Sequence, residues 1–272
     1  MSSALAVAAY IKIRLTPHFS TPRIWSFLSS LNKFWIFCNL LKKGVFFQMD
    51  FISVKGVHKS YKKAASAITV LNGIDVDIRA GETVAVLGAS GAGKSTLLNI
   101  LGALDAPTKG EVFYKGRPFS SMNDGELALF RNRTIGFVFQ FHHLLSEFTA
   151  LENAMLPSLI GGADFKEAKR RASTLLDEVG LGARLDHKPG ELSGGEQQRV
   201  AIVRAIAQSP EIILADEPTG NLDTKTGEEV FELLLRLNRD KNIAIVAVTH
   251  NEALAKRLSR RLRMVDGKIA EQ

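Results

Sequence analysis

The nine residues GASGAGKST, residues 88–96, constrain the fold of this chain more than any other stretch. They fit the pattern G-x-x-x-x-G-K-[ST], whose glycines let backbone N–H groups turn inward around a phosphate where a Cβ would crowd the approach. Lys94 would neutralise phosphate oxygens, and the Ser95 hydroxyl would bind Mg²⁺. An apolar strand pattern precedes the loop, and an apolar helix pattern whose N-terminus favours anions follows it. The stretch therefore predicts a phosphate-binding loop and not a chance glycine-rich turn.

Strand and helix patterns alternate along the chain from Met49 onward. Short apolar runs rich in β-branched residues suit parallel strands covered on both faces, and they occupy residues 83–88, 135–139, 211–216 and 242–250. Ile74, Val76 and Ile78 alternate with aspartates, which predicts a strand with one wet face. Apolar residues at helical spacing over 168–179 predict a helix that ends at Gly180. This alternation predicts a layered α/β domain.

A second candidate motif is IILADEPTGNLD, residues 212–223. One carboxylate at a strand end is often a mere terminator, but two adjacent ones in a chain with a phosphate-binding loop favour chemistry. Asp216 can hold Mg²⁺ through its water shell, and Glu217 can polarise an attacking water. His250 ends another apolar strand and can reach a γ-phosphate as a donor, although a lone histidine is usually structural or merely exposed.

A third motif, ELSGGEQQRVAIVRAIA at residues 191–207, decides the family. Ser193, Gly194 and Gly195 predict a nest of backbone donors that leads into a helix N-terminus, which is a second phosphate-binding device. The alternative is a plain helix cap. The stretch resembles the signature of ATP-binding-cassette (ABC) ATPases, which other P-loop families lack. The resemblance implies that this loop binds the γ-phosphate held by another protomer, with two ATP molecules inside a head-to-tail homodimer.

Companion motifs extend the resemblance over residues 49–272. Tyr61 is similar to the aromatic residue that stacks on adenine, and Gln140 to the glutamine that senses Mg²⁺ and links to a transmembrane partner. His250 is similar to the switch histidine, and NLD at 221–223 to the loop after the catalytic strand. The implied fold is α/β: a P-loop NTPase (RecA-like) core with an inserted α-helical subdomain and an N-terminal antiparallel β subdomain. Its expected boundaries are 49–139 and 196–272 for the core with the β subdomain, and 140–195 for the helical subdomain.

The expected site has three groups of residues, with ATP and Mg²⁺ as cofactors. The catalytic group is Glu217, His250 and Gln140. The nucleotide-binding group is Tyr61, Gly88, Ala89, Ser90, Gly91, Ala92, Gly93, Lys94, Ser95, Thr96, Ser193, Gly194, Gly195 and Glu196. The metal-binding group is Ser95, Gln140 and Asp216.

The stretch FVFQFHHLLSEFTALENAMLP, residues 137–157, contains two adjacent histidines, His142 and His143. Neighbouring side chains point in different directions, and no cysteine or second carboxylate stands at ligand spacing, so a metal site is disfavoured. We expect residues 141–145 to form an exposed surface that docks onto a membrane subunit. Within the ABC family, FQFHHLLSEFTALEN, LGALDAPTKGEV and LADEPTGNLD resemble ATP-binding subunits of lipoprotein-releasing complexes.

This resemblance implies an ATPase that is peripheral to the cytoplasmic face of a bacterial inner membrane. Its partners would be a second copy of the chain and two integral membrane subunits of the lipoprotein-releasing complex. Subunits of macrolide-export and cell-division complexes share most of these motifs and stay as alternatives. A soluble ABC ATPase without a membrane partner is disfavoured, because the chain has one cassette and no long heptad run.

Composition changes sharply at Met49. Residues 1–48 contain six Lys and Arg and no Asp or Glu, which leaves +1 of the overall +7 for the remaining chain. The later residues therefore give no global charge argument for nucleic acid, and none is expected as a partner. A single cysteine, Cys38, excludes a disulfide framework. Uncharged runs such as 34–41 fall short of a membrane span, so a transit peptide or a start assigned upstream of Met49 competes for the extension, and we favour the latter. We expect the extension to be disordered.

Overall fold

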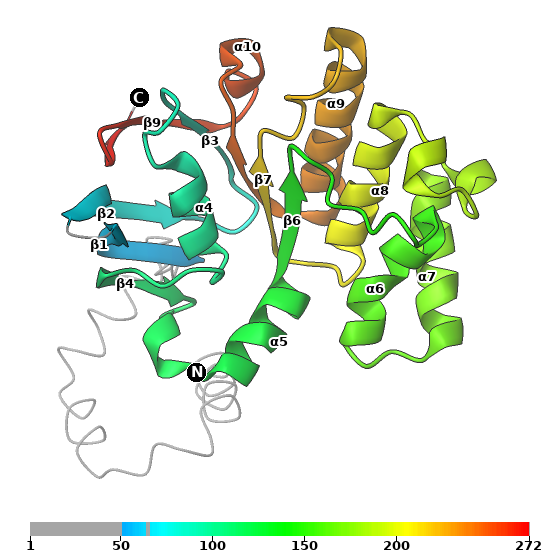
Figure 1. Ribbon diagram of the computed structural model, residues 1–272, viewed down its shortest axis with the longest axis horizontal. Coiled ribbons are helices and arrows are strands. Elements are labelled where there is room, and N and C mark those ends of the chain that lie inside the picture. The colour runs from blue at the N-terminus through cyan, green and yellow to red at the C-terminus, as the bar shows by residue number, and fades with distance from the viewer. Residues whose placement is uncertain (1–50, 64–65, 272) are drawn as a thin grey trace, which may run out of the picture. The chain divides into compact units, whose positions relative to one another are not determined.

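Two sheets organise the computed structural model, which describes residues 51–63 and 66–271 (Figure 1). Our expectations for residues 1–48 lie outside the described residues. The larger sheet has the strand order β10-β9-β3-β8-β7-β6. Its members are β3 (Thr83–Leu87), β6 (Ile135–Phe139), β7 (Ile212–Asp216), β8 (Ala244–Val248), β9 (Arg260–Val265) and β10 (Lys268–Glu271). The strands from β9 to β6 run parallel, and β10 pairs antiparallel with β9. All four runs predicted as parallel strands are confirmed.

The central strands bury side chains on both faces, which is why their sequences show no polar alternation. On β3, Ala85 and Leu87 belong to one apolar core, whereas Val84 and Val86 belong to another. The first core lies between the sheet and the helices that follow β6. The second lies between the sheet, the helix after β3 and the smaller sheet. One sheet therefore separates two cores.

The smaller sheet is antiparallel and has the order β2-β1-β4-β5. Its members are β1 (Ile52–Lys63), β2 (Ser66–Ile78), β4 (Lys109–Tyr114) and β5 (Arg117–Pro118). Ile74, Val76 and Ile78 are buried on β2 while Asp75 is exposed, so the predicted wet face is confirmed. This sheet confirms the antiparallel β subdomain.

Besides three short 3₁₀ helices, seven α-helices lie within the described residues: α4 (Lys94–Leu101), α5 (Asp124–Thr134), α6 (Ala150–Ile160), α7 (Phe165–Glu178), α8 (Gly194–Ile206), α9 (Thr224–Lys241) and α10 (Glu252–Ala255). Helix α7 buries the predicted stripe that starts at Ala168, and Gly180 follows it with a φ of 75°. Helices α6 and α7 pack against each other and against α8. None of these helices is both long and apolar enough to cross a membrane.

Candidate functional site

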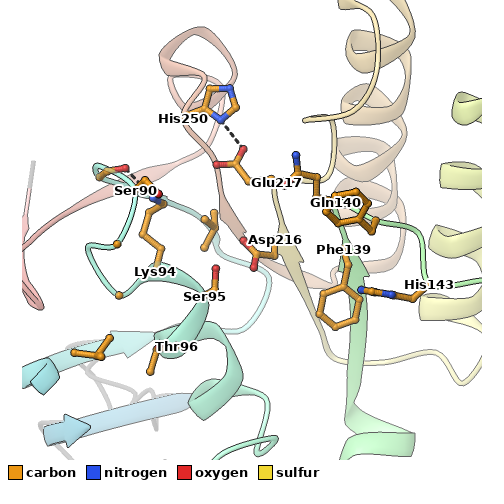
Figure 2. Close-up of a pocket in the computed structure, with 16 residues that line it drawn as sticks. Ser90, Lys94, Ser95, Thr96, Phe139, Gln140, His143, Asp216, Glu217 and His250 are labelled. Atoms are coloured by element: carbon orange, nitrogen blue, oxygen red, sulfur yellow. Dashed lines mark hydrogen bonds and ion pairs between the residues drawn. The ribbon is translucent and has the colours of Figure 1, made fainter. Parts of the chain in front are cut away.

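A cavity of about 720 Å³ lies at the carboxyl ends of β3, β6, β7 and β8 (Figure 2). Parallel strands end on the same edge of a sheet, so segments far apart in the sequence meet here. The lining includes all of the loop 88–96 except Ala89 and Ala92, together with Gln140, Asp216, Glu217 and His250. The structure therefore brings together the phosphate-binding loop, both predicted carboxylates and the predicted histidine. A volume of this size accommodates a nucleotide.

Glycines let the loop 88–96 pass close to neighbouring backbone. Gly88 has a φ of 155°, and a Cβ there would lie 2.4 Å from the Met264 carbonyl oxygen. Gly93 has a φ of 98°, and its Cβ would lie 2.8 Å from the Val70 carbonyl oxygen. A larger residue at either position would displace the backbone of the cradle. The donor N–H groups of the loop therefore depend on glycine, as the motif predicts.

Lys94 extends over its own loop (Figure 2). Its Nζ donates hydrogen bonds to the carbonyl oxygens of Gly88, at 2.8 Å, and of Ala89, at 3.0 Å. These bonds hold the ammonium at the mouth of the cradle, where phosphate oxygens can replace the carbonyl acceptors. The position of Lys94 thus fits the neutralisation of a bound phosphate.

Ser95 and Asp216 face each other across the cavity (Figure 2). Ser95 lies in the first turn of α4, and Asp216 is the last residue of β7. A hydroxyl and a carboxylate are the hard oxygen ligands that Mg²⁺ prefers, usually together with water and phosphate oxygens. The donor set is therefore suitable for this ion.

Glu217 follows Asp216 but points the other way, toward His250 (Figure 2). Its φ is 47°, a value that non-glycine residues adopt rarely and at a cost in conformational energy. The backbone N–H of Glu217 donates to the Val248 carbonyl at 2.9 Å, which secures the turn. The turn gives two adjacent carboxylates different surroundings, one facing Ser95 and the other facing His250.

Gln140 and Asn221 form a reciprocal pair between the segments that follow β6 and β7. The Gln140 side chain donates to Asn221 Oδ1 at 2.9 Å, and the Asn221 side chain donates to the Gln140 carbonyl at 3.1 Å. The sequence motifs include both residues but not their pairing. The pair places the Gln140 side chain beside Glu217 (Figure 2).

Tyr61 lies outside the cavity lining, partly exposed on β1. Its hydroxyl donates to Asp105 at 2.7 Å, and Lys59 pairs with the same carboxylate at 2.5 Å. The Lys59 ammonium also lies 4.8 Å from the centre of the tyrosine ring. Burial and the Asp105 carboxylate raise the pKa of the Tyr61 phenol. These contacts fix an aromatic ring near the cavity, and the sequence motifs assigned no role to Lys59 or Asp105.

Ser193 caps helix α8 in a reciprocal arrangement with Glu196. The Ser193 N–H donates to the Glu196 carboxylate at 2.8 Å, and the Glu196 N–H donates to Ser193 Oγ at 3.3 Å. Hydrogen bonds from Ser193, and then the Arg184 guanidinium at 3.1 Å, hold the pKa of Glu196 below its usual range. Ser193 and Gly194 lie outside the lining of their own chain's cavity. The start of α8 therefore does not contribute to the lining of that cavity.

Residues 141–145 were expected to be more exposed than a core permits, and none of them is buried, although His142 and Leu144 are only partly exposed. Phe141 and Leu145 are 67% and 49% exposed, as expected. Leu144 is instead partly buried and packs against the apolar core formed with α6, α7 and α8. His143 has a φ of 48°, and its ring meets the Phe139 ring edge-on at 5.3 Å between centres. This turn sends Leu144 inward, so only part of the segment is a surface.

Sequence reasoning missed several side chains that hold this segment in place. Asn153 of α6 is fully buried and hydrogen-bonds both backbone groups of Leu145 and the carbonyl of Phe148. Arg204 of α8 donates to the carbonyls of His142 and His143, and Gln198 of the same helix donates to the Phe139 carbonyl just before the segment. The one available signal is that polar residues interrupt otherwise apolar helix faces. It indicates a buried partner without saying which one.

A parallel α/β sheet with a phosphate-binding loop, paired carboxylates and a capped LSGGE helix defines the class of P-loop ATPases with a cassette signature. The sequence matches the ABC transporter family over residues 71–220. That match spans more than half of the chain, and the chain belongs to this family as an ABC transporter ATPase.

Curated relatives agree with this assignment. The chain is 55% identical over 218 residues to a protein of Syntrophus aciditrophicus, covering 80% of this chain and 98% of that one. It is also 55% identical over 223 residues to a protein of Myxococcus xanthus, covering 82% of this chain and all of that one. Both relatives are named lipoprotein-releasing system ATP-binding protein LolD.

A solved structure confirms the fold. The ATP-binding cassette MJ0796, in a dimeric post-hydrolysis state bound to ADP and Pi, superposes with a TM-score of 0.75 at 42% identity. The comparison covers 81% of this chain and 97% of MJ0796. The expected combination of core, helical part and antiparallel β subdomain is therefore confirmed, whereas the exact subdomain boundaries stay a prediction.

Proposed function

We propose that this chain is the ATP-hydrolysing subunit of a complex that releases lipoproteins from the bacterial inner membrane. The observation that carries the proposal is 55% identity over 98–100% of the length of two relatives with that name. The chain would act as a peripheral subunit at the cytoplasmic face, coupled to two integral membrane subunits. The exposed Phe141 and Leu145 beside Gln140 supply a surface for such a partner.

Within this proposal, different residues in and near the cavity bind the phosphates, the adenine and Mg²⁺ or take part in proton transfer. The loop 88–96 and Lys94 would hold the phosphates, and Tyr61 would stack on the adenine. Ser95, Asp216 and Gln140 would hold Mg²⁺, which would neutralise phosphate charge when bound. Glu217 would accept the proton of the attacking water, with its carboxylate oriented by His250 Nδ1 at 2.9 Å.

The start of α8 supports a homodimer. The Ser193 loop leads into the positive end of a helix, a place suited to an anion. Ser193 and Gly194 lie outside the cavity lining of their own chain, so we infer that they bind the γ-phosphate of a second copy. MJ0796 was solved as a dimer, which supports the same arrangement.

Reconstitution tests the proposed function. The full chain would be purified with its two membrane subunits, placed in proteoliposomes that contain an inner-membrane lipoprotein, and supplied with ATP and Mg²⁺. We expect ATP-dependent release of the lipoprotein to a soluble acceptor, and no release with Lys94→Met. ATP hydrolysis without release, together with transport of a macrolide, would favour the export alternative.

A further inference from the structure

The segment from Phe139 to Phe148 has neither helical nor strand hydrogen bonding beyond the end of β6, yet several of its backbone carbonyls are occupied. Side chains from other elements serve as donors. Asn221 donates to the carbonyl of Gln140, and Asn153 donates to the carbonyls of Leu145 and Phe148. The segment that carries Gln140 is therefore held in shape from outside.

Two further donors come from α8, the helix whose first turn follows Ser193. Arg204 donates through Nη1 to the His143 carbonyl at 2.6 Å and through Nη2 to the His142 carbonyl at 2.7 Å. Gln198, which is buried, donates to the Phe139 carbonyl at 3.3 Å and to the Pro218 carbonyl at 2.7 Å. Helix α8 thus hydrogen-bonds backbone carbonyls both before Gln140, at Phe139, and after it, at His142 and His143.

Arg204 is an unusual choice for a purely structural contact. It forms no ion pair with any carboxylate in the part of the chain that the structure describes, and burial lowers the pKa of its guanidinium. A charge in this position costs desolvation energy, which two charge-assisted bonds to carbonyls partly offset. A neutral apolar residue would avoid that cost but would leave both carbonyls without this donor, so the arginine contributes mainly by fixing the position of the backbone that it binds.

The backbone that Arg204 binds is itself strained. His143 has a φ of 48°, which non-glycine residues rarely adopt without support from their surroundings. The two donors of the rigid guanidinium fork bind the carbonyl of this residue and that of His142 before it. The fork therefore fixes the turn that follows Gln140, and a lysine, with one compact ammonium, does not reproduce that geometry.

We propose that Arg204 is a positioning residue that locks the Gln140 segment to helix α8, so that Gln140 and the Ser193 loop hold a fixed relation to each other. The inference rests on the proposed function, in which Gln140 serves one nucleotide and the Ser193 loop serves that of a second copy. With these bonds in place, a movement of the segment from Phe139 to Phe148 is transmitted to helix α8 and hence to the Ser193 loop at its start. Without them, each nucleotide would bind while the two halves of the composite site lose their alignment.

The test compares Arg204→Met and Arg204→Lys with the unchanged full chain, and with Arg171→Met as a matched control. Arg171 of α7 donates to Ser209 Oγ, so its loss removes an arginine contact away from Gln140. Three quantities are measured: the Kd for a fluorescent ATP analogue, the kcat and KM of ATP hydrolysis, and hydrogen exchange of amides 141–149.

Arg204→Met should lower kcat by about ten-fold or more, because small misplacements of positioned groups are costly to catalysis. The nucleotide Kd should stay within about three-fold, because the cavity contacts are intact. Exchange should rise in residues 141–149 but not in α4 or β7. The kcat of Arg204→Lys should lie between those of Arg204→Met and the unchanged chain. The kcat of Arg171→Met should equal that of the unchanged chain.

Two outcomes would overturn the proposal. One is a kcat for Arg204→Met within about two-fold of the unchanged chain, well short of the expected effect. The other is a loss of kcat matched by loss of nucleotide binding and by faster exchange in α4 and β7, which would show general destabilisation. Glu217→Gln is measured in parallel: normal turnover there would refute the proposed catalytic site, whereas an inactive Glu217→Gln with a normal Arg204→Met would refute only the positioning role.

Discussion

His250 Nδ1 lies 2.9 Å from Oε2 of Glu217, so that a largely exposed imidazole meets a mostly buried carboxylate between the ends of β7 and β8. The contact depends on the positive φ of Glu217, which turns this carboxylate away from Asp216. Two adjacent acidic residues consequently serve different neighbours.

Glu217→Gln should bind ATP normally and hydrolyse it roughly 10²–10⁴ times more slowly, because the amide keeps the shape of the side chain but cannot accept a proton. The variant should accumulate as an ATP-bound dimer. Steady-state hydrolysis and size-exclusion chromatography with ATP measure both effects. Near-normal turnover would remove Glu217 from the catalytic role.

Gly91→Ala and Gly93→Ala separate two costs in the phosphate-binding loop. Gly91 has a φ of 79° and open space where a Cβ would lie, so alanine should cost only the left-handed backbone penalty, about 1–2 kcal/mol. Gly93 adds a Cβ placed 2.8 Å from the Val70 carbonyl, so its substitution should cost roughly 3 kcal/mol or more. Urea unfolding measures both, and equal costs would contradict the steric argument.

Phe141→Asp and Leu144→Asp should separate docking from folding. Phe141 is exposed and also lines the cavity, so Phe141→Asp should leave the melting temperature unchanged while weakening assembly with the membrane subunits by roughly 2 kcal/mol, the usual cost of losing an interface anchor. Leu144 packs on the core, so its substitution should destabilise the free subunit. Thermal melting, nucleotide binding and pull-down of the membrane subunits form the test. Loss of nucleotide binding with intact pull-down for Phe141→Asp would assign this residue to the ATP site.

Asp105→Asn should raise the KM for ATP roughly three- to ten-fold with little change in kcat, because a less ordered Tyr61 ring must be fixed when the base binds. The substitution removes the charge that holds both Tyr61 and Lys59. Asp75→Asn is the control, since Asp75 accepts a hydrogen bond from the Gly56 N–H elsewhere on the same hairpin. Steady-state kinetics with ATP decide the matter, and an unchanged KM would separate Tyr61 from adenine binding.

His142 should make stability depend on pH below neutrality. Burial, followed by the charges of Arg204 and His143, lowers the pKa of His142, against an opposing hydrogen bond to Gln197. The folded state therefore resists protonation, so this contribution to stability is complete above the unfolded value of about 6.5 and is lost as pH falls toward the folded pKa. Urea unfolding at about pH 7.5 and about pH 5.5, on either side of that value, should show a smaller decrease for His142→Gln than for the unchanged chain. Identical decreases would contradict this account.

The local patterns of the sequence predicted the strands and the phosphate-binding loop because each depends on neighbours in the chain. Alternation at Ile74, Val76 and Ile78 reports one wet face, and the glycines of residues 88–96 report backbone conformation. Leu144 could not be placed in the same way, because its direction depends on the turn at His143 and on a donor 61 residues beyond that turn. The roles of Lys59 and Asp105 were missed for the same reason, since their contact joins residues 46 apart.

The position of the Ser193 loop at the start of helix α8 has a kinetic consequence. A chain whose Ser193 loop lies outside its own cavity carries two half-sites that, under the proposed dimer, become productive only on encounter with a second copy. At concentrations below the dimer Kd, the hydrolysis rate of the free subunit should therefore grow as the square of the subunit concentration. Membrane subunits that hold two copies side by side would replace this bimolecular step with a high local concentration, so the transporter itself would set when ATP is consumed.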